Sequence, residues 1–375
     1  MNSLIEQYID DKKVIICGGS GGVGKTTTSA AIAIKAAEKG KKVLVLTIDP
    51  ARRLADSLGI KIGNEEVKVS DEIFKSAGIE IKGELYAMML DMKRSFDDLI
   101  DKIAPNNETR DKILNNRLYN NVTSALSGSQ EYIAMEKLYD VYSKGEYDLI
   151  VLDTPPTRHA VDFLNAPKKM VDFLDAGIIN IMLKTYFKLG GWGLKFLKGG
   201  SNTIFALVEK VTGGEILRDV SEFFMAFEGM YDGFKDRSKD VTELLKSNVS
   251  TILIVLGPQY INIDEAFFFY DKISEMGIHF GFFVMNRMHI VPEDFIWTKN
   301  EKKEVKKLLE EDSAVILEWI NKYIAVSKSD RESAMMIKNR TRQPVYLVKE
   351  FTEDIHDIPS LYKFVNNLLS SEIIV

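Results

Sequence analysis

Residues 14–28, VIICGGSGGVGKTTT, place a glycine-rich loop between an apolar run and the start of a helical pattern. Gly19 to Thr26 fit the spacing G-x-x-x-x-G-K-T, which forms a phosphate-binding loop when a strand precedes it and a helix follows it. The run VIICG has the composition of a buried strand, and the residues that follow, TTTSAAIAIKAAEKG, are typical of a helix that ends at Gly40. The stretch therefore predicts a strand, a phosphate-binding loop and a helix, in that order.

The residue types of this loop suit the binding of nucleotide phosphates. Glycine allows backbone N–H groups to turn toward a β-phosphate, and the positive end of the helix dipole favours the same anion. Lys25 can reach the β- and γ-phosphates of ATP, and the Thr26 hydroxyl can bind Mg²⁺. We therefore expect ATP to be bound by Gly19, Ser20, Gly21, Gly22, Val23, Gly24, Lys25, Thr26 and Thr27.

Short apolar runs rich in β-branched residues recur along the chain, and helical patterns separate most of them. Such runs suit a sheet that is covered on both faces, and the alternation of strands with helices predicts parallel pairing. The expected fold class is therefore α/β, with a doubly wound, mostly parallel sheet of the P-loop NTPase type and an inserted α-helical subdomain. The expected strands are 14–18, 42–49, 84–91, 148–153, 251–257, 281–287 and 345–348.

Two stretches depart from this alternation. Residues 92–145 and about 160–248 carry long helical patterns without a convincing strand, so we expect one domain over 1–375 with a helical subdomain inserted between core strands. Residues 163–234 of this subdomain are rich in Met and Phe. Such side chains most often form the core of their own subdomain, but they also suit the capture of apolar helices because they repack easily.

Charge and composition disfavour several classes of function. Lys plus Arg number 49 against 55 Asp plus Glu, a net charge of −6, which disfavours a nucleic-acid-binding surface. The first residues lack a signal-peptide pattern, and the most apolar later segment, IINIMLKTYFKLGGWGLKFL, is interrupted by lysines. We therefore expect a cytoplasmic protein that meets membranes only through a client. Cys17 is the single cysteine, which excludes an intrachain disulfide and a cysteine-based metal site.

Two acidic residues, Asp49 and Asp153, each end a predicted strand, where the ligand sites of α/β proteins form. Isolated acids at such positions are more often helix caps. Beside a phosphate loop, however, Asp49 could align the attacking water, and Asp153 could complete the Mg²⁺ shell. We therefore expect catalytic roles for Lys25, Asp49 and Asp153, and metal binding by Thr26 and Asp153.

Five motifs together resemble a known family: the loop GSGGVGKTT, DPARRLAD, ELYAMMLD, DTPPTRH and FFVMNR. In order and spacing they are similar to the arsenical-pump and tail-anchored-protein-targeting ATPases, the ArsA/GET type, within the MinD/ParA-like class of P-loop proteins. The resemblance implies nucleotide-gated dimers, with Asp49 in the first switch loop and Asp153 to His159 in the second. It also implies that Asn286 bonds the adenine under the segment after Val348, although Asn286 could instead be a strand-end turn residue.

The chain departs from that family in its phosphate loop. The family loop reads GKGGVGKT, and its first lysine reaches the phosphates of the partner subunit, whereas this chain has Ser20 at that position. Arg52 or Arg158 could supply the missing charge, or both could form ordinary surface pairs. Alternatively, Ser20 could mark a subunit that works with a lysine-bearing paralogue. Both a homodimer and a heterodimer therefore stay open.

The departures also bear on function. A single cysteine excludes the cysteine-based metal sites of the family, and a single phosphate loop excludes a chain with two ATPase halves, so arsenite transport is disfavoured. The leading hypothesis is a Mg-dependent, dimerising ATP hydrolase whose helical subdomain binds an apolar client segment, such as a membrane protein's tail, under nucleotide control. The alternative is a regulatory or assembly ATPase switch that acts with a paralogous subunit or a soluble partner. Positioning on DNA is disfavoured by the acidic charge balance.

Overall fold

The computed structural model divides the chain into two compact units. The first unit comprises Met1–Met89, Gly145–Val161 and Leu245–Val375, and the second comprises Leu90–Lys144 and Asp162–Leu244. The residues that the structure describes are 3–48, 53–116, 119, 129–175, 223, 226, 229–291, 298, 303, 307 and 313–375. Among these, side chains are left out at 129–130, 157–160, 162–163, 173–175 and 313–314.

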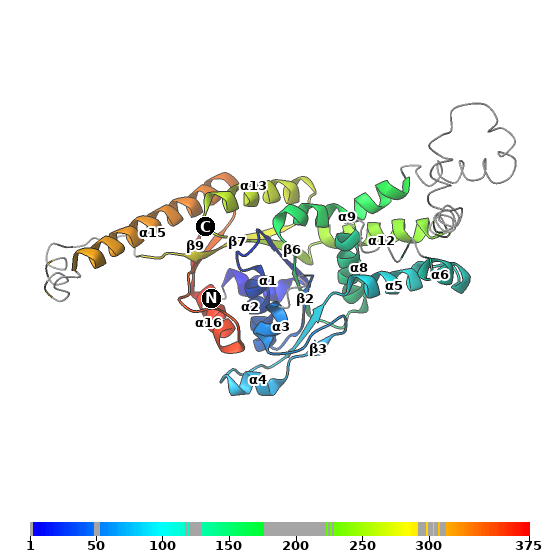
Figure 1. The fold of residues 1–375 in the computed structure, drawn as a ribbon, viewed down its shortest axis with the longest axis horizontal. Helices are drawn as coiled ribbons and strands as arrows, with labels where there is room; N and C mark the ends of the chain where they lie inside the picture. The colour runs from blue at the N-terminus through cyan, green and yellow to red at the C-terminus, as the bar shows by residue number, and fades with distance from the viewer. Residues whose placement is uncertain are drawn as a thin grey trace, which may run out of the picture. The chain divides into compact units, whose positions relative to one another are not determined.

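A nine-stranded sheet forms the centre of the first unit (Figure 1). Its strand order is β3-β4-β2-β5-β1-β6-β7-β8-β9. The strands from β4 to β8 in this order pair in parallel, and β3 and β9 pair antiparallel at the two edges. The strands are β1 Val14–Gly19, β2 Lys42–Thr47, β3 Val67–Lys68, β4 Glu84–Met89, β5 Leu149–Asp153, β6 Ser250–Leu256, β7 Phe280–Met288, β8 Val345–Lys349 and β9 Glu372–Ile374.

The parallel strands confirm the expected α/β fold class. β1, β5 and β6 are buried at every residue, which explains why their sequences are apolar without alternation. The sequence did not predict the two edge strands, because β3 and β9 have only two and three residues. Segments this short show no recognisable alternation of apolar and polar residues. β9 is held against the body of the unit by Arg331, whose two terminal nitrogens each donate to Glu372 at 2.8 Å.

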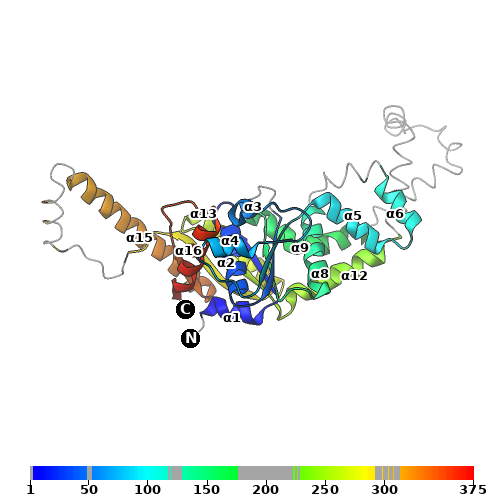
Figure 2. The ribbon, with the colours of Figure 1, turned by 90° about the horizontal axis from the view of Figure 1, so that it is seen from below.

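Helices cover both faces of the sheet. One face packs against α1 (Leu4–Asp11), α2 (Lys25–Glu38), α3 (Arg53–Leu58), α4 (Asp71–Ser76) and α16 (Ile358–Ser370). α13 (Tyr260–Glu275) and α15 (Ser313–Thr341) lie on the other side (Figure 1). α1 and α16 both pack against α2 (Figure 2), which fixes the helix that follows the phosphate loop.

The second unit is helical in its described residues. Its main elements are α5 (Met92–Ile103), α6 (Asn107–Leu114), α8 (Ser129–Lys144) and most of α9 (Thr157–Asp175) and α12 (Tyr231–Lys246). The interpretation of these helices as an insertion in a single domain stays a prediction.

An ion pair lies inside the second unit. Arg237 donates to the buried Glu136 carboxylate from two nitrogens, at 2.8 and 2.7 Å. Burial raises the pKa of the Glu136 carboxyl, and the guanidinium of Arg237 opposes that rise. The pair ties α8 to α12, because Glu136 lies on the first helix and Arg237 on the second. Removal of either side chain would leave the charge of the other buried without a partner.

The Met- and Phe-rich stretch lies mostly outside the described residues. Among its described members, Leu164, Phe223, Met230 and Phe234 are buried, whereas Met170 is half-buried. Phe234 packs its ring 6.1 Å from that of Tyr132 on α8. These four side chains therefore belong to the core of the second unit, as the simpler interpretation of the stretch expects.

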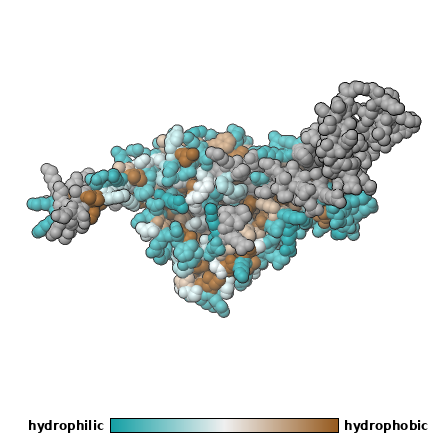
Figure 3. Space-filling view, in the orientation of Figure 1, coloured by the Kyte–Doolittle hydropathy of each residue, from teal (hydrophilic) through white to brown (hydrophobic). Residues whose placement is uncertain are grey.

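Several large apolar side chains of the first unit are exposed on α13 and α15. The large exposed ones on α13 are Tyr260, Ile261 and Phe268, and those on α15 include Val315, Trp319 and Met336. Figure 3 shows apolar spots separated by polar atoms over this face, a pattern that is usual for a protein surface. Among the described helices, none combines the length and the apolar character needed to cross a membrane.

Candidate functional site at the phosphate loop

The predicted phosphate loop connects β1 to α2 at the carboxyl edge of the sheet. Gly19 has a φ of 148°, and a Cβ there would lie 1.9 Å from the carbonyl oxygen of Val255 on β6. Gly24 has a φ of 102°, and a Cβ there would lie 2.3 Å from the side-chain nitrogen of Asn286. Glycine is therefore required at both ends of the loop, by conformation and by space.

The N-terminus of α2 offers its amides to an anion. The helix begins at Lys25, and its N-cap, Gly24, has no side chain to accept from the first-turn N–H groups. Those donors have no partner within a helix, and the helix dipole adds a partial positive charge at the same end. The loop and helix thus form the anion-binding arrangement that the spacing predicted.

Lys25 is held inside the loop. Only 8% of its surface is exposed, and its Nζ donates to the main-chain oxygen of Ser20 at 2.7 Å. The ammonium therefore lies against the loop itself, within reach of any phosphate that enters it.

The Ser20 side chain is turned toward α13. Its hydroxyl donates to Oε2 of Glu265 at 2.5 Å, and only 6% of the residue is exposed. A hydrogen bond to a charged acceptor is short and strong, so the hydroxyl is committed to Glu265. Ser20 thus contributes its carbonyl to the loop and its side chain to the anchoring of that loop on α13.

Asp153 gathers two hydroxyls at the end of β5. Its Oδ2 accepts from Thr26 Oγ1 at 2.7 Å and from Thr47 Oγ1 at 3.0 Å, and the residue is 1% exposed. The structure therefore brings together Thr26 and Asp153, the two residues predicted to bind a metal. A hydroxyl and a carboxylate are oxygen ligands of the kind that Mg²⁺ prefers, so the pair fits that ion.

A cavity of about 860 Å³ opens at this edge of the sheet. On one side it is lined by loop and α2 residues, namely Gly21, Gly22, Gly24, Lys25, Thr26 and Thr27. The other lining residues are Arg53, Asp56, Ser57, Thr154, Pro156, Arg287, Ile355 and His356. None of these eight residues was predicted individually from the sequence, although Thr154 and Pro156 belong to the predicted second switch and the segment after Val348, which holds Ile355 and His356, is predicted to cover the adenine.

Asn286 lies under the loop and is 6% exposed. Its side-chain nitrogen donates to the carbonyl oxygen of Val23 at 2.9 Å, and its Oδ1 accepts from the backbone N–H of Arg287 at 2.9 Å. The amide thus ties the end of β7 to the phosphate loop. Its contact with a base stays a prediction.

Several predicted residues cannot be placed. Asp49 and Arg52 lie outside the described residues, as do the side chains of Arg158 and His159. The proposed alignment of a water by Asp49 and the replacement of the missing charge by an arginine therefore stay predictions.

Cys17 is a core residue of β1. Burial raises the pKa of its thiol to about 12, so the thiolate that would act as nucleophile or metal ligand does not form at neutral pH. In the part of the chain that the structure describes, no group of three or more His, Cys, Asp or Glu side chains is arranged around a metal position.

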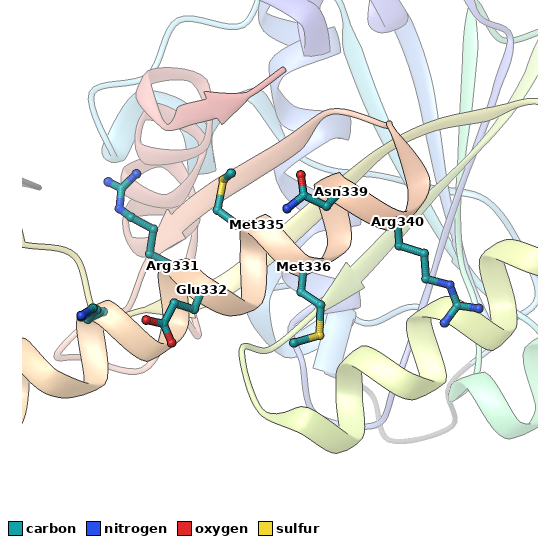
Figure 4. Close-up of a pocket in the computed structure, with 7 residues that line it drawn as sticks. Arg331, Glu332, Met335, Met336, Asn339 and Arg340 are labelled. Atoms are coloured by element: carbon teal, nitrogen blue, oxygen red, sulfur yellow. The ribbon is translucent and has the colours of Figure 1, made fainter.

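A second cavity, of about 780 Å³, runs along α15. Figure 4 shows that its labelled lining residues come from this one helix and that Met336 and Arg340 point toward α13. Arg340 donates to Asp271 at 2.8 Å and lies 4.1 Å from the ring centroid of Phe267, so its charge is already engaged. The cavity has neither a glycine loop nor a helix N-terminus among its lining residues, which makes it a poor phosphate site.

A glycine loop between the first strand and helix of a parallel sheet, with a lysine and a threonine at the helix start, defines a P-loop nucleotide-binding protein. The sequence profile of the anion-transporting ATPases, ArsA_ATPase, matches residues 12–323. The chain therefore belongs to this family of ATPases, as the five motifs predicted.

Individual relatives agree with this membership. The chain is 26% identical to an "ATPase GET3" of Malassezia globosa, over 77% of each sequence. It is also 26% identical to a "Putative arsenical pump-driving ATPase 1" of Aquifex aeolicus, over 79% of this chain and 70% of that protein. An "ATPase ASNA1 homolog 1" of Paramecium tetraurelia is 28% identical over 79% of this chain and 80% of its own length.

The hydrogen bond between Ser20 and Glu265 can be tested by a double-mutant cycle with Ser20→Ala and Glu265→Ala. We expect a coupling free energy of about 0.5–2 kcal/mol, because each single change removes the same charge-assisted bond. The readout is the denaturant dependence of Cys17 labelling in nucleotide-free protein, since the buried thiol reacts only when the first unit opens.

The exposed pair Lys272 and Glu275, on the same helix, provides the control cycle. We expect its coupling to stay below about 0.5 kcal/mol, as is usual for exposed ion pairs. Additive effects of Ser20→Ala and Glu265→Ala would contradict the assignment.

Proposed function

We propose that the cavity at the phosphate loop binds ATP together with Mg²⁺ and hydrolyses the γ-phosphate. The observation that carries the proposal is that Lys25 and Thr26 line the cavity at the start of α2 and that the buried carboxylate of Asp153 accepts a hydrogen bond from Thr26. A cation, a hydroxyl and a buried carboxylate next to the first-turn amides of a helix are the groups that phosphoryl transfer requires.

Each of these groups has a task in the proposed reaction. The amides at the start of α2 receive the phosphate oxygens, and Lys25 exchanges the Ser20 carbonyl for the β- and γ-phosphates. Thr26 and Asp153 would hold Mg²⁺, which supplies positive charge that stabilises the phosphates when it is bound. Asp49 orients the attacking water. Because Lys25 and Asp153 are buried, their charges act in a weakly screened environment.

In this chain Ser20 stands where the family loop carries the lysine that acts across a dimer, so the cation must come from another residue. The Ser20 hydroxyl carries no charge and is bound to Glu265, which supports this part of the proposal. We propose that Arg52 or Arg158 provides the charge, in the same subunit or across a dimer. A lysine-bearing paralogue in a heterodimer is the competing source.

Steady-state ATP hydrolysis with Lys25→Ala tests the proposed site. We expect the substitution to lower kcat by at least about 100-fold, because it removes a cation that contacts the transferring phosphoryl group. Chelation of Mg²⁺ should abolish turnover of the unmodified protein.

Lys39→Ala is the matched control, because Lys39 caps the opposite end of the same helix and pairs with Asp10. Its turnover should equal that of the unmodified protein. Turnover of Lys25→Ala at the wild-type rate, or turnover of the unmodified protein without Mg²⁺, would contradict the proposal.

We further propose that the second unit couples the nucleotide state to a partner, with an apolar client segment as the leading partner and a soluble protein or paralogous subunit as the alternative. Support for a client comes from the Met- and Phe-rich composition of 163–234 and from family membership. The burial of Phe223, Met230 and Phe234 removes these three side chains from any client surface. A client would therefore contact other members of the stretch.

Capture from native lysate distinguishes the two kinds of partner. The bait is Asp49→Asn loaded with Mg-ATP, which should bind nucleotide but hydrolyse it slowly, and Lys25→Ala is the nucleotide-free control. Enrichment of proteins with a single C-terminal apolar helix on the loaded bait is the expected result. Recovery of a lysine-bearing paralogue or of soluble enzymes alone would favour the regulatory switch and contradict client binding.

A further inference from the structure

The carboxylate of Asp153 has a cross-strand neighbour to which the proposed function gives no role. In the parallel sheet, Asp153 on β5 pairs with Thr47 on β2 and with Cys17 on β1. Paired residues of adjacent strands place their side chains on the same face of the sheet. Here this is the face covered by α2, because Thr26 on α2 donates to Asp153 and Cys17 belongs to the core beneath that helix. Thr47 therefore brings a second hydroxyl beside the carboxylate.

The two threonines share one oxygen of Asp153. Oγ1 of Thr47 donates to Oδ2 at 3.0 Å, and Oγ1 of Thr26 donates to the same Oδ2 at 2.7 Å. Thr47 and Asp153 are each 1% exposed, so this hydrogen bond is screened from water. Two donors on one oxygen fix the rotation of the carboxylate, because a turn of the group would stretch both bonds. The orientation of Asp153 is thus set by β2 as well as by α2.

The two donors differ in their relation to the proposed metal. Thr26 is a proposed ligand of Mg²⁺ and lines the cavity, whereas Thr47 is not among the described residues that line it. The bond from Thr47 belongs to the pairing of β2 with β5, which continues in the bond from the Ile48 N–H to the Asp153 carbonyl at 3.4 Å. Thr47 can therefore hold the carboxylate in one orientation whether or not the metal is bound.

We propose that Thr47 is the positioning residue of the metal site, and that its hydroxyl fixes the carboxylate of Asp153 for the binding of Mg²⁺ together with the nucleotide. A donor that orients a metal ligand raises the affinity of the site for the metal. The assignment rests on the proposed function, because it requires Asp153 to hold the metal. It also links the metal site to the chain that leads to Asp49, two residues further along the sequence.

The test is the affinity for ADP, measured by titration calorimetry with excess Mg²⁺ and again with a chelator. The factor by which Mg²⁺ strengthens ADP binding reports the coupling of metal and nucleotide. Thr47→Val keeps the shape of the side chain and removes the hydroxyl. We expect it to lower this factor by about 10-fold, while its affinity for ADP in the chelator changes by less than about twofold.

Two further variants separate the hydroxyl from the packing of the strand. Thr47→Ser keeps a donor and should retain most of the Mg²⁺ factor. Thr251→Val is the matched control, because it removes a buried hydroxyl from the start of β6 that donates to the carbonyl of His279 at 3.4 Å. It should leave the Mg²⁺ factor unchanged. In steady-state hydrolysis, Thr47→Val should raise the Mg²⁺ concentration needed for half-maximal turnover more than it lowers kcat at saturating Mg²⁺.

Three results would overturn the assignment. Equal weakening of ADP binding with and without Mg²⁺ in Thr47→Val would make Thr47 a support of the strand end only. An unchanged Mg²⁺ factor in Thr47→Val, or an equal loss in Thr47→Ser, would show that the hydroxyl does not position the metal ligand. If Mg²⁺ does not strengthen ADP binding to the unmodified protein, the proposed function itself fails, and that outcome is distinguishable because it does not depend on residue 47.

Discussion

The buried carboxylate of Asp153 is the interaction on which the site depends. It lies at the carboxyl end of β5, between β1 and β2, and accepts hydrogen bonds from Thr47 on β2 and Thr26 on α2. A carboxylate that is 1% exposed would be costly without such donors. The two hydrogen bonds therefore hold the ends of β2 and β5 and the start of α2 in one arrangement, and the phosphate loop runs from β1 into that helix start.

The conformation of the phosphate loop depends on its close contacts with neighbouring strands. Gly19 allows the chain to pass close to β6, and Gly24 allows it to turn over Asn286. A bulge in β7, between Met285 and Met288, then brings a second element against the loop, and its residue Arg287 enters the cavity. The site is thus assembled from both halves of the sheet: residues that follow β1, β2 and β5 line the cavity, and so do Arg287 on β7 and two residues of the segment after β8.

The sequence was sufficient for the parts of this site that are local. A lysine and a threonine after a glycine loop and an apolar strand must lie at a helix start, so the phosphate end and the parallel sheet could be predicted. The hydrogen bond from Ser20 to Glu265 could not, because it joins residues 245 positions apart and follows from the packing of α13. The bulge at Asn286 and Arg287 was also invisible, because FGFFVMNRM is typical of one uninterrupted strand. Ile355 and His356 lie in the segment after Val348 that the resemblance predicts to cover the adenine, but neither residue could be singled out, because their place in the cavity depends on the path of the chain after β8.

Hydrogen–deuterium exchange with and without Mg-ATP tests most directly whether the two ends of the cavity bind one nucleotide. We expect slowed exchange in three separate peptides, around residues 19–28, 285–291 and 350–357, with little change in α4 at the far edge of the sheet. The three segments should also respond at the same nucleotide concentration. Slowed exchange in the phosphate loop alone would contradict a base site at the end of β7. An unchanged phosphate loop would contradict nucleotide binding at this edge of the sheet.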